Sequence, residues 1–273
     1  LKLMQLPMYC WAMLGTSLLV VLSTPVLAGT LVLLSFDIVA HTGFFNPAMG
    51  GNVVVYQHLF WFYSHPAVYI MVLPAFGLVS EILPVHARKP LFGYTTMVYS
   101  IMAIVFLGLI VWAHHMYMTG MGATVAAFFQ VTTIMISIPS VILITALMLS
   151  LWGGSIRFTM PMLFATAFMP MFGIGGLTGI PLAFNAVDMY LHDTYYIIGH
   201  FHYVVAPGTI FAIFAGVYYW FPKATGRMMN EFLGRIHFWG SLIFINGLFF
   251  PMFLQGMAGV HRRWYDGGGA SLE

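Results

Sequence analysis

Residues 126–152, AAFFQVTTIMISIPSVILITALMLSLW, form the stretch that decides the fold, because no charged side chain interrupts it. At about 1.5 Å per residue, a helix of this length crosses the roughly 30 Å hydrocarbon core of a bilayer. Comparable apolar stretches lie on both sides of it in the chain. The whole set falls at residues 9–35, 53–83, 94–118, 126–152, 160–182, 194–221 and 236–257. The pattern predicts an all-α, polytopic membrane helix bundle of seven transmembrane helices, in a single domain over residues 1–273.

The composition of the whole chain agrees with this prediction. Of its 273 residues, 61% are hydrophobic and 6% are charged, whereas soluble domains carry about 25% charged residues. A soluble enzyme is therefore excluded, and the 17% aromatic content excludes a disordered chain. The single cysteine, Cys10, excludes a disulfide framework and a cysteine-ligated zinc or iron–sulfur site. The net charge of +2 is too small for a nucleic-acid-binding protein.

Basic residues sort the loops onto two sides of the membrane. The loops after the second, fourth and sixth stretches carry Arg88, Lys89, Arg157, Lys223, Arg227 and Arg235. The loops after the other stretches carry no Lys or Arg until the seventh, so the positive-inside rule places the basic loops in the cytoplasm. Arg262 and Arg263 are exceptions, since they follow the seventh stretch on the outer side. The outer loop after the fifth stretch holds Asp188, His192 and Asp193.

A core set of five histidines lies within the apolar stretches, where ionisable side chains are costly and are functional candidates by default. They are His65, His114, His115, His200 and His202. Counted along the helices, all five fall in the outer half of the membrane at compatible depths. A single membrane histidine ordinarily makes an interhelical hydrogen bond, but five at matched depth favour metal ligation. These stretches offer neither a cluster of cysteines nor a pair of carboxylates as metal ligands. Iron or copper held by imidazole is therefore the chemistry left.

The spacing of four of these histidines separates them into two kinds of site. His200 and His202 are two residues apart, about 200° around a helix, so they point to opposite sides. They cannot share a metal, but each can hold one. His114 and His115 are about 100° apart, and one histidine from another helix would complete a three-nitrogen site with them.

A tyrosine lies one helical turn from the histidine of the second stretch. His65 and Tyr69 are four residues apart, so their side chains share one helix face, about 6 Å apart at Cβ. Pro66 lies between them and predicts a kink in this helix. Spacing alone favours an ordinary packing tyrosine over a covalent link to the histidine.

Three motifs carry a resemblance to a known family. They are WFYSHPAVY at residues 61–69, WAHHM at residues 112–116 and HDTYYIIGHFHY at residues 192–203. In this order and spacing they resemble subunit I of the haem–copper oxygen reductases, and the resemblance extends over about residues 7–263. It implies seven helices of the family's twelve-helix core, in a fragment that lacks the early helices and the last helix.

The resemblance implies roles for the motif residues. His65, His114 and His115 are similar to the ligands of the active-site copper. His200 is similar to the proximal ligand of the high-spin haem, and His202 to an axial ligand of the low-spin haem.

Further roles follow from the same resemblance. Tyr69 resembles the tyrosine that the family cross-links to the first copper histidine and that supplies an electron and a proton during O–O cleavage. Trp61 resembles a tryptophan packed beside the copper site. Residues similar to those that bind or neighbour haem propionates are Arg262, Arg263 and Asp188. Residues similar to the ligands of a magnesium ion at the interface with subunit II are His192 and Asp193.

The chain departs from the family at both proton channels. Many members have a glutamate where this chain has Ala67, and a variant A-type subgroup is similar in carrying Tyr63 and Ser64 instead. The lysine of a second channel is replaced by Leu143. Small hydroxyl residues of the same stretch are Ser140, Ser137, Thr132 and Thr133. They could carry a water chain, although interhelical hydrogen bonding is the favoured interpretation.

The resemblance implies the catalytic subunit of a terminal oxidase, which reduces O2 to water and couples this to proton translocation. Cytochrome c or a quinol would supply the electrons through the low-spin haem, with subunit II and other oxidase subunits as partners. The implied location is a bacterial-type inner (plasma) membrane or another energy-transducing membrane.

Two alternatives remain at this point. A nitric oxide reductase of the same superfamily converts NO to N2O without pumping; Leu143 favours it and Tyr69 opposes it. A membrane subunit that lacks redox activity and scaffolds a partner or transports ions conflicts with the five histidines.

Overall fold

The computed structural model describes residues 2–264, and these residues form a bundle of helices. The α-helices are α1 (Met8–Val39), α2 (Val53–Ala87), α3 (Tyr94–Gly108), α4 (Ala123–Leu151), α5 (Met160–Ala183), α6 (Asn185–Leu191), α7 (Tyr195–Tyr203), α8 (Phe211–Thr225) and α9 (Glu231–Met257). Three 3-10 segments are η1 (Leu3–Gln5), η2 (Pro47–Met49) and η3 (Trp112–Thr119), and a π-helix is η4 (Val204–Ile210). The predicted all-α fold is confirmed.

Seven segments in the described part of the chain are long and apolar enough to cross a membrane, as predicted. The third combines α3 with η3, and the sixth runs through α7, η4 and α8. The seventh begins at Glu231, five residues before the predicted start at residue 236, because Asn230 caps the helix by accepting a hydrogen bond from the Leu233 amide. These segments support a multi-pass membrane protein.

Two interruptions differ from the predicted pattern. The third segment leaves α-helical geometry after Gly108 and resumes as the tighter η3 at Trp112. The sixth segment contains the π-helix η4, which includes Pro207; a proline cannot donate the hydrogen bond that a regular helix requires. Both interruptions lie beside the histidines that the sequence singles out.

The second segment is one continuous helix, and the kink at Pro66 stays a prediction. α2 runs as one helix through Pro66, Pro74 and Pro84. Prolines are tolerated in membrane helices because neighbouring helices and local adjustments satisfy the backbone groups that they free.

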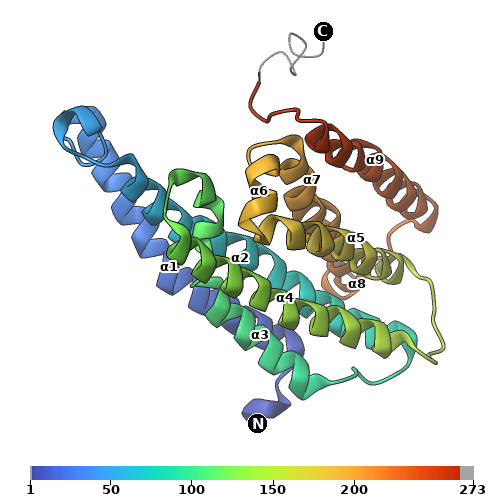
Figure 1. Cartoon of the computed structure of the whole chain (residues 1–273). Helices are drawn as coiled ribbons and strands as arrows, with labels where there is room; N and C mark the ends of the chain where they lie inside the picture. Colours follow the sequence, from blue (N-terminus) through green and yellow to red (C-terminus); the bar gives the residue numbers. More distant parts are fainter. Residues whose placement is uncertain (1, 265–273) are drawn as a thin grey trace.

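α2 lies at the centre of the bundle, where it packs against α1, α3, α4, α5 and α8. α1 and α9 stand at opposite edges (Figure 1). The buried core joins Leu73 and Phe76 of α2 to Ile101 of α3 and Phe168 of α5, each at most 1% exposed. This packing holds α2 between α5 and α3, and α3 leads into the η3 segment that carries His114 and His115.

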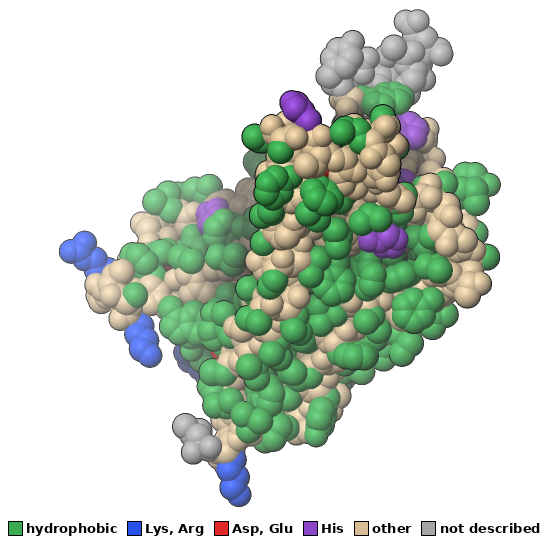
Figure 2. Space-filling view, turned by 90° about the vertical axis from the view of Figure 1, so that its left-hand side faces the viewer, with side chains coloured by type: hydrophobic (Ala, Val, Ile, Leu, Met, Phe, Trp, Pro, Cys, Tyr) green, Lys and Arg blue, Asp and Glu red, His purple; other side chains and the backbone are tan. Residues whose placement is uncertain are grey.

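The outer surface of the bundle is apolar. Figure 2 shows a face covered largely by hydrophobic side chains, with Lys and Arg confined to its lower and left-hand edges. On the edge helices, Val21 of α1 is 68% exposed and Phe244 of α9 is 76% exposed. Such a surface fits contact with lipid or with other membrane helices rather than with water.

Candidate metal centre

The first candidate ligand, His65, projects from the middle of α2 and is 5% exposed. Its ring meets the Tyr69 ring edge-to-face, with the centroids 4.7 Å apart. The Tyr69 ring lies against α3 at Gly108, where an added Cβ would come within 3.1 Å of Tyr69 Cδ2. His65 and Tyr69 are therefore neighbours on one face of an unbroken helix, as predicted from their spacing.

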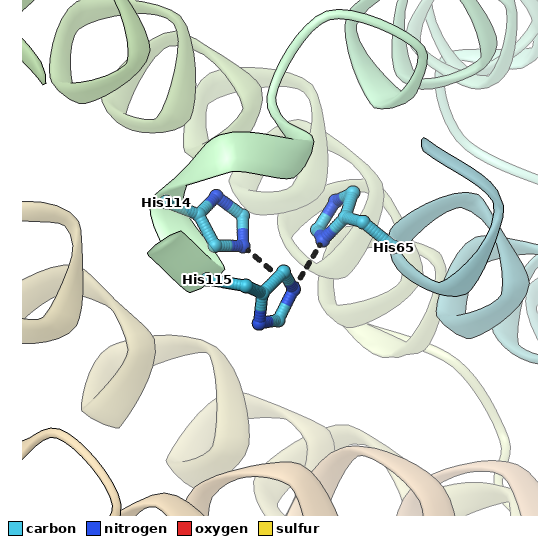
Figure 3. Close-up of side chains that lie close together, drawn as sticks. All are labelled: His65, His114 and His115. Atoms are coloured by element: carbon cyan, nitrogen blue, oxygen red, sulfur yellow. Dashed lines mark hydrogen bonds between the residues drawn. The ribbon is translucent and has the colours of Figure 1, made fainter. Parts of the chain in front are cut away.

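The other two candidates of this cluster come from η3. The 3-10 segment turns His114 and His115 toward α2, so that all three imidazoles face one another (Figure 3). His115 Nε2 lies 3.1 Å from His65 Nδ1 and 3.1 Å from His114 Nε2. The structure thus brings together the three histidines that the sequence assigned to one site.

The geometry of this trio fits a metal ion. One nitrogen from each ring lies within 4.8 Å of the others, and among the described residues this is the one group of three or more His, Cys, Asp or Glu so placed. Metal–imidazole bonds of about 2 Å would hold three such nitrogens about 3–3.5 Å apart. An all-nitrogen donor set suits copper, iron or zinc rather than magnesium or calcium.

The tautomer of His114 is fixed by a neighbour on α4. The Thr133 hydroxyl donates to the Phe129 carbonyl at 2.5 Å, so its oxygen accepts a hydrogen bond from His114 Nδ1 at 2.9 Å. With its proton on Nδ1, His114 presents the Nε2 lone pair to the site. The sequence grouped Thr133 with other hydroxyl residues and did not predict this contact.

One tryptophan stacks on the trio, and a second binds another histidine of α2. Trp61 stacks on His115 with the centroids 3.9 Å apart and the planes 8° apart, which places it against the three-histidine cluster. Trp112 donates from its indole nitrogen to His58 Nδ1 at 3.2 Å. The sequence did not single out His58; its position seven residues before His65, on the same helix face, was the available signal.

His200 and His202 contact different helices, as expected for opposite faces of α7. His200 Nδ1 donates to the Gly175 carbonyl of α5 at 2.8 Å. His202 Nδ1 donates to the Ile198 carbonyl at 2.8 Å, and its ring stacks on Phe249 of α9 at 4.3 Å. In both rings Nδ1 is occupied and Nε2 remains available, so each histidine could ligate an iron.

The outer polar residues form a chain of opposite charges. Asp193 Oδ1 lies 3.9 Å from Arg262 Nε and 3.8 Å from Arg263 Nη1, and Asp193 Oδ2 lies 3.8 Å from His192 Nε2. His192 Nδ1 lies 3.3 Å from Asp188 Oδ2. This contact and the nearby charge of Asp193 raise the pKa of His192. Asp188 is 3% exposed, and its Oδ2 is the oxygen that faces His192. The five predicted residues of this side therefore lie together, and they offer a magnesium ion few ligands of their own.

The position of the second channel's lysine is filled by an apolar side chain. Leu143 is fully buried in the apolar core. Ser140 donates to the Ile136 carbonyl at 3.1 Å, and the Thr132 hydroxyl lies within bonding distance of carbonyls on its own helix and on Ile110. These contacts favour the interpretation that the hydroxyls of Ser140 and Thr132 serve helix packing.

The chain matches a family model described as cytochrome C and quinol oxidase polypeptide I over residues 1–272. It is 57% identical over 263 residues to cytochrome c oxidase subunit 1 of Synechocystis sp., covering 96% of this chain and 48% of that protein. It is 53% identical to cytochrome c oxidase subunit 1 of Thermostichus vulcanus, covering 95% of this chain and 47% of that protein.

The fold also matches a chain from a cryo-EM structure of a heme-copper terminal oxidase dimer, with a TM-score of 0.85 and 23% identity. This match covers 96% of the present chain and 49% of the other. The chain therefore spans about half the length of the relatives it matches.

Proposed function

Since the chain belongs to the cytochrome c and quinol oxidase polypeptide I family, we propose that it is part of the catalytic subunit of a terminal oxidase that reduces O2 to water. The observation that carries the proposal is the convergence of three imidazoles beside a tyrosine at the centre of the bundle. Packing histidines have no reason to converge in this way.

Each histidine has a proposed cofactor. His65 Nδ1, His114 Nε2 and His115 Nε2 hold the copper, His200 holds the high-spin haem and His202 holds the low-spin haem. When bound, these groups supply the redox chemistry, because they bind O2 and deliver electrons to it. The chain itself orients the imidazoles, through Thr133 at His114 and through backbone carbonyls at the other two sites.

Tyr69 is the proposed source of a proton and an electron during cleavage of O2. Its ring lies against His65, whose Nε2 is buried without a hydrogen-bond partner among the described residues. This arrangement supports a covalent bond between His65 Nε2 and the Tyr69 ring. Forming that C–N bond removes two protons and two electrons, for which O2 reduced at the same centre is the acceptor.

The outer charges are proposed to serve binding. Arg262 and Arg263 neutralise haem propionates, with Asp188 beside them. His192 and Asp193 contribute ligands to a magnesium ion, and subunit II or water supplies the remainder. Their position on the outer side, next to the segment that carries His200 and His202, supports this assignment.

Protons and electrons enter by routes that this stretch of chain defines only in part. The buried Leu143 and the carbonyl-bonded hydroxyl of Ser140 support a proton route through other residues. The proposed reduction of O2 is coupled to proton translocation. The relatives are named cytochrome c oxidases, which favours cytochrome c over a quinol as the electron donor. The proposed location is a bacterial inner (plasma) membrane or another energy-transducing membrane.

Turnover of the purified complex with O2 and, separately, with NO tests the proposal. We expect a reduced-minus-oxidised spectrum with two haems and rapid O2 consumption with reduced cytochrome c. Faster turnover of NO than of O2 would select the nitric oxide reductase, and a spectrum without haem bands would leave only a subunit without redox activity.

A further inference from the structure

One glycine of α5 borders a predicted haem ligand although α5 carries no predicted ligand itself. A Cβ added at Gly179 would lie 2.6 Å from His200 Cε1 and 3.3 Å from both ring nitrogens of His200. Real Cβ contacts are essentially never as short as the first of these distances. The His200 ring therefore occupies the space that a side chain at position 179 would fill.

The ring has little freedom to leave this space. Its Nδ1 donates to the Gly175 carbonyl at 2.8 Å, and the Thr178 hydroxyl lies 3.4 Å from the same nitrogen. Gly175 and Gly179 are four residues apart, on one face of α5. One turn of helix thus supplies both the hydrogen-bond acceptor and the open space for a single imidazole.

The two helices cannot separate easily to admit a methyl group. A Cβ at Gly175 would lie 2.9 Å from both the backbone nitrogen and Cγ2 of Val204, where α7 meets η4. Backbone contact at this distance means that α5 already lies directly against the segment that carries His200. A side chain at position 179 would have to displace the imidazole itself.

We propose that Gly179 is a positioning residue for the high-spin haem, because its missing side chain sets where His200 Nε2 meets the iron. This inference rests on the proposed role of His200 as the proximal ligand. In this proposal α5 contributes to the haem site because the absence of a side chain at Gly179 leaves room for the His200 ring. A larger residue at position 179 should change the iron–histidine bond and leave the low-spin haem at His202 unaffected.

The test compares Gly179→Ala with Gly176→Ala in the intact oxidase complex. Gly176 lies on the same helix, where an added Cβ has no atom within 4 Å among the described residues. Both changes replace glycine with the better helix former, so their difference reports the contact with His200. Resonance Raman spectroscopy of the reduced complex measures the iron–histidine stretching frequency, and CO binding measures the content of high-spin haem.

We expect Gly179→Ala to shift the stretching frequency or to lose CO-binding haem, while the low-spin haem at His202 keeps its absorbance. Gly176→Ala should match the wild type in all three readouts. A Gly179→Ala complex with wild-type frequency and haem content overturns the inference. The proposed function fails separately, if the wild-type complex lacks CO-binding haem or if His200→Ala leaves the iron–histidine signal in place.

A second background decides the case in which Gly179→Ala loses both haems. In a His200→Gly complex, added imidazole takes the place of the missing ring, and its dissociation constant can be titrated. Gly179→Ala in this background should weaken imidazole binding relative to Gly176→Ala. Equal dissociation constants for the two variants overturn the inference.

Discussion

The three-imidazole centre and the two histidines of α7 hold their rings in different ways. At the centre, His114 is oriented by a side chain, the Thr133 hydroxyl. On α7, His200 and His202 each donate to a backbone carbonyl. Removing the hydroxyl partner should therefore loosen the three-imidazole centre. The histidines of α7 are held by backbone carbonyls, which a side-chain substitution cannot remove, so they should respond only to loss of the ring or to an added side chain that displaces it.

The largest effect is expected at the three-imidazole centre, where one substitution should remove copper and leave the haems of α7 in place. His114→Ala removes one of three converging nitrogens, so we expect loss of copper and of O2 turnover with both haems retained. Metal analysis and haem spectra of the same sample measure this. Copper content and activity at wild-type values would show that His114 is not a ligand.

The two faces of α7 should separate in the same manner. His202→Ala should remove the low-spin haem signal, because its ring faces α9, whereas His200→Ala should remove the CO-binding haem, because its ring faces α5. Optical spectra with and without CO distinguish them. Identical spectra for the two variants would contradict haems on opposite faces.

Tyr69→Phe changes the chemistry of the three-imidazole centre without removing a ligand. We expect copper and both haems to bind while O2 turnover is lost, because phenylalanine has no phenolic proton to give. Peptide mass spectrometry of the wild type should show residues 65 and 69 in one cross-linked peptide. Full O2 reduction by the variant would favour the nitric oxide alternative.

Thr133→Val should have a smaller effect on the same centre. It removes the acceptor for His114 Nδ1, and loss of such an outer partner typically lowers metal affinity about 10–100-fold. Thr133→Ser keeps the hydroxyl and is the matched control. Copper titration of the depleted complexes measures the difference, and equal affinities for both variants would remove Thr133 from the site.

The smallest expected effect is that of Ser140→Ala. Its hydroxyl donates to the Ile136 carbonyl on the same helix, so we expect O2 turnover and its pH profile to stay close to the wild type. A large loss of turnover would instead place Ser140 on the proton route to the centre.

The sequence was sufficient for the spans and for the core set of histidines, because both depend on strong local signals. The grouping of His65 with His114 and His115 rested on the resemblance of the three motifs to a known family. Apolar runs long enough for a bilayer determine the helices, and an imidazole inside such a run is rare. The break between Gly108 and Trp112 was not predicted, because the residues there are as apolar as the helix before them. Yet this break turns His114 and His115 toward α2.

The supporting residues were harder to predict. Thr133 and Ser140 are both small hydroxyl residues on α4, and only the fold shows that Thr133 faces a histidine while Ser140 bonds its own helix. Gly179 carries no side chain, so its contact with His200 depends on how closely two helices approach. Long-range contacts of this kind leave no local pattern in the chain.

An anomalous difference map from crystals of the purified complex, recorded at the copper absorption edge, would locate the metal among the three imidazoles. We expect one copper peak within bonding distance of His65 Nδ1, His114 Nε2 and His115 Nε2. The absence of a copper peak among these three nitrogens, in a complex that reduces O2, would contradict the proposed copper site.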